Sequence, residues 1–177
     1  VGDGTSYRKV VVVGLGKQDE FDAERVRQVS ASAAKAAVKG DVKSVATIVH
    51  GAGIGGLDVE EAARCVAEGT ILGLYRYDKY KSKKDDGDTR GHGVAELLII
   101  ERDGNKIGAI MEAVSRGVIL AESTNFARDL VNAPANELTP TVLAERARAM
   151  AEESGLECEI LDRAAMEELG MGALLGV

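Results

Sequence analysis

The segment from His50 to Gly56 has the residue types and spacing of a nucleotide-binding loop. Gly51, Gly53 and Gly56 follow an apolar run and precede a helical pattern, as in the dinucleotide-binding motif. Asp78 comes roughly 20 residues later, where that motif places a ribose-binding carboxylate. However, Asp78 adjoins a lysine-rich loop and not the end of a strand, and a chain with 21 glycines matches such patterns by chance. We therefore favour a mobile glycine-rich connection without a ligand, and keep nucleotide binding as the alternative.

A second loop, around Gly16 and Lys17, resembles the end of a phosphate-binding loop. That motif also requires a glycine at position 11 and a serine or threonine at position 18, where this chain has Val11 and Gln18. The motif is therefore rejected, and Lys17 is interpreted as a solvated residue that follows a strand.

The other titratable residues do not form a metal-binding or nucleophilic pattern. His50 and His92 have no acidic residue or cysteine at ligand spacing. Asp85, Asp86 and Asp88 lack the spacing of a calcium loop and indicate a solvated loop instead. No serine or cysteine lies in a nucleophile elbow, so the sequence offers no candidate for covalent catalysis.

A basic stretch near several aromatic residues is the remaining candidate for nucleic-acid binding. It consists of four lysines and three tyrosines, namely Lys79, Lys81, Lys83, Lys84, Tyr75, Tyr77 and Tyr80. The tyrosines precede the lysines and do not interleave with them throughout, as a stacking platform for bases would require. The net charge of −7 also opposes attraction to nucleic acid or to an anionic membrane. We therefore expect neither as a partner, with DNA binding through residues 79–84 as a lesser alternative.

Composition places the chain among soluble globular proteins. Its 177 residues are 45% hydrophobic and 29% charged, enough for one domain or for one and a fraction. No apolar run approaches the roughly 20 residues that span a bilayer. Cys65 and Cys158 do not form a disulfide framework, and no basic-then-apolar leader opens the sequence. We expect a cytoplasmic protein with reduced thiols.

The abundance of alanine and glycine, with only 3% aromatic residues, favours a layered α/β architecture over an all-β fold. The apolar and alternating runs predict strands, in chain order, at residues 10–13, 42–49, 94–100, 156–161 and from 173 onwards. Helical periodicity predicts helices that begin after Asp19 or Asp22, after Asp58, near Lys106 and at Pro140. Thr139 is the expected N-cap of the last of these helices, and Gly155 ends it.

Residues 125–140, Asn-Phe-Ala-Arg-Asp-Leu-Val-Asn-Ala-Pro-Ala-Asn-Glu-Leu-Thr-Pro, resemble the domain-connecting segment of the leucyl aminopeptidase (cytosol aminopeptidase) family. Residues 13–17, 73–84 and 169–175 support the resemblance in order along the chain. Asn132 to Asn136 themselves are interpreted as turn residues that fix the angle between two domains.

The resemblance implies a macro-domain-like mixed sheet flanked by helices in residues 1–104, a linking helix and connection in 105–137, and the opening of a catalytic α/β domain in 138–177. It implies a hexameric enzyme that removes N-terminal residues from peptide substrates with two divalent metal ions, zinc or manganese. We expect the start of the first domain to be clipped and the second domain to be cut short.

The family's metal ligands and catalytic groups lie in Lys-Gly-…-Phe-Asp-Ser-Gly-Gly and Asn-Thr-Asp-Ala-Glu-Gly-Arg motifs, and neither motif occurs here. No residue is therefore assigned as catalytic, cofactor-binding or metal-binding, and we expect this chain alone to be inactive and to hold no cofactor. The alternative to an aminopeptidase portion is a macro-like module that binds a nucleotide or an ADP-ribose-like ligand through residues 51–56.

Overall fold

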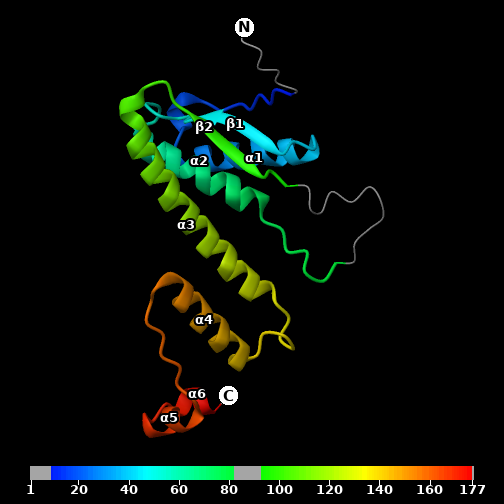
Figure 1. Cartoon of the computed structure of the whole chain (residues 1–177), viewed down its shortest axis with the longest axis vertical. Coiled ribbons are helices and arrows are strands. Elements are labelled where there is room, and N and C mark those ends of the chain that lie inside the picture. The colour runs from blue at the N-terminus through cyan, green and yellow to red at the C-terminus, as the bar shows by residue number, and fades with distance from the viewer. Residues whose placement is uncertain (1–8, 82–92, 177) are drawn as a thin grey trace. The chain divides into compact units, whose positions relative to one another are not determined.

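The computed structural model describes residues 9–81 and 93–176, which form six helices and a two-stranded sheet (Figure 1). The elements are, in order, α1 (Ala23–Lys39), β1 (Ser44–Ile48), α2 (Val59–Leu74), β2 (Glu96–Ile100), α3 (Ile107–Asn132), α4 (Pro140–Ser154), α5 (Arg163–Glu168) and α6 (Gly172–Leu175). Single 3-10 turns precede α1 and α3. The chain divides into two compact units, residues 1–128 and 129–177, which are described separately.

The sheet of the first unit consists of two parallel strands. β1 and β2 pair in register from Ser44 opposite Glu96 to Ile48 opposite Ile100, and α2 connects them. Because parallel neighbours need a crossover, this is the strand–helix–strand unit that the sequence predicts. The strands predicted at 42–49 and 94–100 are confirmed, and so is the α/β class.

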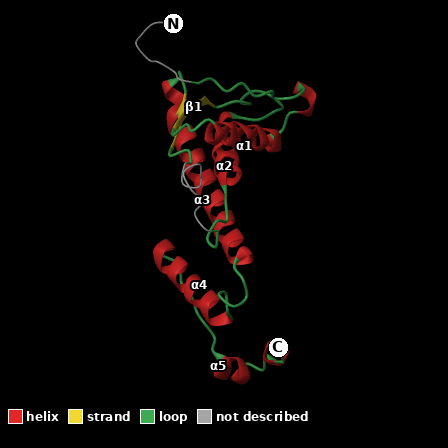
Figure 2. Ribbon diagram, turned by 90° about the vertical axis from the view of Figure 1, so that its right-hand side faces the viewer, coloured by secondary structure: helices red, strands yellow, loops and turns green. Residues whose placement is uncertain are grey.

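Helices α1 and α2 pack on one face of the sheet (Figure 2). The main hydrophobic core of the first unit lies between these helices and the sheet. From the sheet, Leu97 and Ile99 pack against buried residues of both helices, among them Val26 and Val66. The two strands are exposed on alternate residues, so Ile48, Leu98 and Ile100 form an exposed apolar face opposite the helices.

Both helices begin where the sequence predicts. The Asp22 carboxylate accepts a hydrogen bond from the Arg25 amide at 2.8 Å, and Asp58 accepts one from the Glu61 amide at 2.7 Å. Each carboxylate satisfies an amide that has no partner inside its helix. Asp22, rather than the alternative Asp19, is therefore the cap of α1.

The two helices approach closely because glycines of α2 face α1. A Cβ on Gly69 would lie 2.3 Å from the carbonyl oxygen of Arg27, and one on Gly73 would lie 2.5 Å from the Cβ of Ala31. Any larger residue at either position would push the helices apart. These glycines explain why an alanine- and glycine-rich chain can build a tight helical layer.

The apolar run Val10 to Val13 is not a strand, contrary to the prediction. Residues 9–17 have no regular secondary structure, and the Val10 and Val12 side chains are 81% and 90% exposed. A strand is stable only when its amides and carbonyls pair with a neighbour. Within the described residues, β1 and β2 pair with each other and not with this segment.

Two strands predicted in the second unit are also wrong. Residues 156–161 are irregular, and residues 172–175 form the short helix α6 instead of a strand. Leu175 and Gly176 donate hydrogen bonds to the carbonyls of Met171 and Gly172, at 3.2 and 3.1 Å. Helical bonds of this kind need no second strand, which the described part of this unit does not provide.

Helix α4 of the second unit begins and ends as predicted. Thr139 Oγ1 accepts a hydrogen bond from the Val142 amide at 3.4 Å, Pro140 is the first helical residue, and Gly155 ends the helix with φ +68°. Pro at the first position and a left-handed glycine at the end are common signals of helix termini.

Replacing the cap residue tests this assignment. We expect Thr139→Ala to destabilise α4 by about 1 kcal/mol, because the Val142 amide loses its acceptor. Hydrogen exchange of residues 141–146 measures the effect. Unchanged exchange in these residues would show that Thr139 does not cap the helix.

Candidate functional site

The glycine-rich loop between β1 and α2 uses its own backbone groups to close on itself. Gly53 donates a hydrogen bond to the Leu57 carbonyl at 2.9 Å, Ile54 to Gly51 at 2.9 Å, and Leu57 to Ile54 at 3.1 Å. In a phosphate-binding loop, such amides point at the ligand instead. The loop therefore lacks the free amide donors that a pyrophosphate would need from these three residues.

Packing against Phe21 explains two of the loop's glycines. Phe21 is only 5% exposed and belongs to the main core. A Cβ on Gly51 would lie 2.8 Å from the Phe21 ring, and one on Gly55 would lie 2.0 Å from the Phe21 carbonyl oxygen. Both glycines also have positive φ, at +97° and +60°. The glycine pattern thus follows from close packing and from turn geometry.

Asp78, the expected ribose ligand, lies at the other end of α2 from this loop. The helix begins at Val59, directly after the loop, and ends at Leu74. Sixteen helical residues rise about 24 Å. The Asp78 carboxylate instead pairs with Lys81 at 2.7 Å and with Arg76 at 3.4 Å. The structure therefore does not bring the two parts of the dinucleotide motif together.

His50 has a structural partner in the core. Its Nε2 lies 3.2 Å from Ser30 Oγ, and the Ser30 hydroxyl donates to the Val26 carbonyl at 2.9 Å. The Ser30 oxygen can then accept a hydrogen bond from the imidazole N–H. Among the described residues, no three His, Cys, Asp or Glu side chains gather as a metal site would require. His92, Asp85, Asp86 and Asp88 lie outside the described residues.

The cationic residues that the sequence singles out make contacts with nearby residues where they are described. Lys17 pairs with Glu20 at 3.0 Å on the surface, which agrees with its interpretation as a solvated residue. Lys79 lies over the Tyr80 ring, 5.2 Å from its centroid, and the Tyr77 and Tyr80 rings are 6.0 Å apart. Lys83 and Lys84 lie outside the described residues. The described part of the basic stretch is thus a folded turn.

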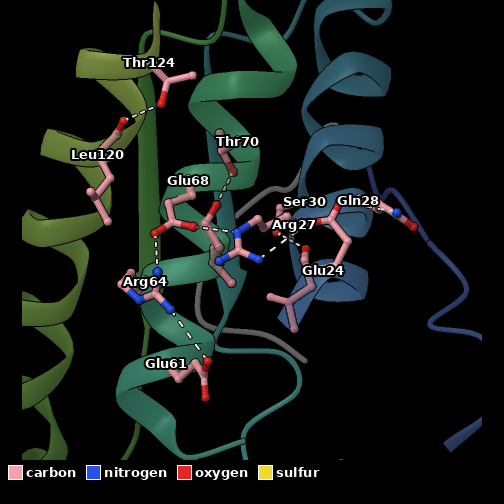
Figure 3. A network of polar contacts seen from close by, with 12 residues as sticks. Glu24, Arg27, Gln28, Ser30, Glu61, Arg64, Glu68, Thr70, Leu120 and Thr124 are labelled. Carbon is pink, nitrogen blue, oxygen red and sulfur yellow. Dashed lines mark hydrogen bonds and ion pairs between the residues drawn. The ribbon is translucent and has the colours of Figure 1, made fainter. Parts of the chain in front are cut away.

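A buried carboxylate that the sequence analysis missed connects α1 to α2 (Figure 3). Glu68 is 5% exposed and accepts hydrogen bonds from Arg27 Nε at 2.5 Å and from Arg64 Nη1 at 2.6 Å. Burial lowers the pKa of Arg27, but the hydrogen bond to Glu68 and the nearby negative charges outweigh that effect and raise it. The i,i+4 spacing of Arg64 and Glu68 is visible in the sequence. The contact with Arg27 on α1 is not.

Cys65 lies beside this network but is not a nucleophile. Burial raises the pKa of its thiol, although the Arg27 and Arg64 charges act in the opposite direction. A thiol with a raised pKa is protonated and unreactive at neutral pH. Cys65 is buried and Cys158 is exposed, and both are free, as the sequence predicts.

A cavity of about 200 Å³ between α2 and α3 is a further polar feature that the sequence analysis missed. Its lining residues are Asp58, Glu60, Glu61, Arg64, Glu112, Ala113 and Arg116. Its arginines pair with its acids, Arg64 with Glu61 at 3.6 Å and Arg116 with Glu112. The lining thus carries four carboxylates and two guanidinium groups, an excess of negative charge.

Comparison with known proteins gives the decisive observation. Residues 1–84 match the N-terminal domain of the cytosol aminopeptidase family, and residues 125–177 match the catalytic domain of the same family. The two matches together cover more than half of the chain. The chain belongs to the cytosol aminopeptidase family.

Relatives in this family support the assignment along the whole chain. A probable cytosol aminopeptidase of Aquifex aeolicus is 40% identical over 98% of this chain and 33% of its own length. One of Solibacter usitatus is 42% identical over 98% of this chain and 34% of its own length. The chain thus spans about a third of the length of the curated relatives that it matches.

A solved structure with a similar chain supports the fold. The bottromycin maturation enzyme BotP is 36% identical, with a TM-score of 0.73 over 89% of this chain and 31% of that one.

None of the helices in the described residues combines the length and the apolar character needed to cross a membrane.

Proposed function

We propose that this chain forms the N-terminal α/β domain, the linking helix and the opening of the catalytic domain of a metal-dependent leucyl aminopeptidase. The three parts are residues 1–104, 105–137 and 138–177. The observation that carries the proposal is the order of the family matches, with the N-terminal domain before the catalytic domain. In this proposal the intact enzyme is a cytoplasmic homo-hexamer that removes N-terminal amino acids from peptides.

The small number of buried residues in the second unit supports the proposal that this unit is the first part of a larger domain. Among its described residues only Ala151 is buried, whereas Leu156, Leu169 and Leu174 are at least 60% exposed. A domain needs a core in which its helices and strands bury their apolar faces. Further parts of the catalytic domain would supply that core.

The residues described here do not fit the metal centre of such an enzyme. No group of three potential ligands occurs among them, and zinc or manganese centres in proteins need several oxygen, nitrogen or sulfur ligands around each ion. The proposal therefore assigns the two metal ions, zinc or manganese, to the intact enzyme. It assigns no catalytic, cofactor-binding or metal-binding role to a residue of this chain.

Hydrolysis of leucine p-nitroanilide tests the proposal. We expect the purified chain to release no p-nitroaniline above background, with or without zinc or manganese. A protein that carries this sequence and extends to the length of its relatives should hydrolyse the substrate, and a chelator should abolish its activity. Turnover by the chain alone, or no aminopeptidase activity in the extended protein, would contradict the proposal.

The alternative function, a nucleotide-binding module, gains no support from the loop's internal hydrogen bonds. Calorimetric titration of the chain with ADP-ribose, NAD and ATP distinguishes the two functions. We expect no binding in the micromolar range, and micromolar affinity for any of the three would favour the alternative.

A further inference from the structure

The helix α3 packs on the core only as far as Ala121. Its buried residues are Ile110, Ala113, Gly117 and Ala121, which form one stripe at helical spacing. A Cβ on Gly117 would lie 2.7 Å from the carbonyl oxygen of Arg64, so α3 crosses α2 closely at this point. After Ala121 the helix continues to Asn132 without a buried residue. Its second half therefore needs another contact if it is to be restrained.

Arg128 provides such a contact in the second half of α3. Its guanidinium carbon lies 5.3 Å from the centroid of the Tyr75 ring. Arg128 Nη1 also donates a hydrogen bond to Asn125 Oδ1, one helical turn earlier, at 3.3 Å. A guanidinium over an aromatic face is attracted by the ring's quadrupole.

Tyr75 is fixed to the core of the first unit. It is the C-cap of α2, and its amide donates to the Leu72 carbonyl at 3.4 Å. Two residues earlier, Gly73 packs directly against Ala31 of α1. The ring is therefore attached to the end of a helix whose last turn cannot move away from α1 without losing that packing.

We propose that the Tyr75–Arg128 pair is a latch that restrains the second half of α3, the part of the helix from which the chain leaves the first unit. Tyr75 lies in the range that matches the family's N-terminal domain, and Arg128 lies in the range that matches its catalytic domain. The latch thus joins the N-terminal domain to the start of the catalytic sequence. Arg128 and Tyr75 act by holding the helix in place.

Hydrogen exchange of the 177-residue chain tests the latch. Because an exposed cation–π contact contributes about 0.5–1 kcal/mol, its loss should speed the exchange of residues 122–132 about two- to five-fold. We expect this in Tyr75→Leu and in Arg128→Met, and no further increase in the double variant. Tyr75→Phe keeps the aromatic face and should exchange like the unaltered chain.

Two further readouts separate the latch from general destabilisation. The exchange of residues 107–121 should be the same in all these variants. The side-chain protons of Arg128 should show an upfield ring-current shift that persists in Tyr75→Phe and disappears in Tyr75→Leu. Unchanged exchange at 122–132 in Tyr75→Leu, equal acceleration in Tyr75→Phe, or an equal change at 107–121 would overturn the proposal. None of these outcomes depends on aminopeptidase activity, so the proposed function stands or falls separately.

Discussion

We expect Glu68→Ala to lower the free energy of unfolding of the first unit by about 3 kcal/mol, because it removes the shared acceptor of a buried ion-pair network. Arg27 and Arg64 both donate to this carboxylate, and their side chains are only 26% and 29% exposed. Without Glu68, each guanidinium would keep only a longer contact, Arg27 with Glu24 at 3.5 Å and Arg64 with Glu61 at 3.6 Å, and would lack full hydration. Removing one partner of a buried ion pair lowers the free energy of unfolding by more than the intact pair contributes, because the remaining charge is poorly compensated.

Urea unfolding followed by tyrosine fluorescence measures this loss. All four tyrosines of the chain precede residue 129, so the signal reports the first unit. Glu112→Ala is the matched control, since Glu112 forms an exposed i,i+4 pair with Arg116, and we expect it to cost less than about 0.5 kcal/mol. Equal effects of the two substitutions would show that the buried network contributes no more than a surface pair.

The features that the sequence predicts well are those that depend on nearby residues. Asp22, Asp58 and Thr139 cap helices because each accepts a hydrogen bond from an amide three residues later. The two confirmed strands, β1 and β2, are joined by a helix, and a connection of that kind strongly favours parallel pairing. Such signals lie within a few residues of one another or in a well-known supersecondary unit.

The features that the sequence does not predict depend on residues far apart in the chain. The apolar run at 10–13 has the composition of a buried strand, but no partner strand pairs with it in the described residues. Residues 156–161 and 173–176 alternate or are apolar in the same way, and they too lack a partner there. A strand depends on its neighbour, whereas a helix makes its own hydrogen bonds.

The same limit applies to the candidate site. The Arg27–Glu68 contact joins residues 41 positions apart, so no local spacing indicates it. In the glycine-rich loop, local spacing suggests a site that the structure does not support, because the spacing fits a nucleotide motif. The residue against which the loop packs, Phe21, precedes it by 30 residues and belongs to no motif. Spacing alone does not distinguish a glycine that a ligand needs from one that a neighbouring residue needs.

Substitutions in this loop separate the two reasons for a glycine. We expect Gly55→Ala to cost at least about 2 kcal/mol more than Gly53→Ala, the typical penalty of an overpacked site. Both glycines have positive φ, at +60° and +79°, so both alanine variants incur a similar backbone penalty of about 1–2 kcal/mol. Only at Gly55 does the added Cβ meet the backbone of Phe21, while the space around Gly53 is open.

Urea unfolding of the two variants measures the difference, and titration with ADP-ribose shows whether the loop also binds a ligand. If the loop served a pyrophosphate, the unaltered chain would bind ADP-ribose, and Gly53→Ala would abolish that binding with little loss of stability beyond its backbone penalty. If the glycine at 55 serves the packing of Phe21, only Gly55→Ala unfolds at a markedly lower urea concentration, and no variant binds ADP-ribose. Because Phe21 contacts the core on which β2 packs, the Gly55→Ala variant should also expose Leu97 and Ile99, detectable as faster hydrogen exchange along residues 96–100 than in Gly53→Ala.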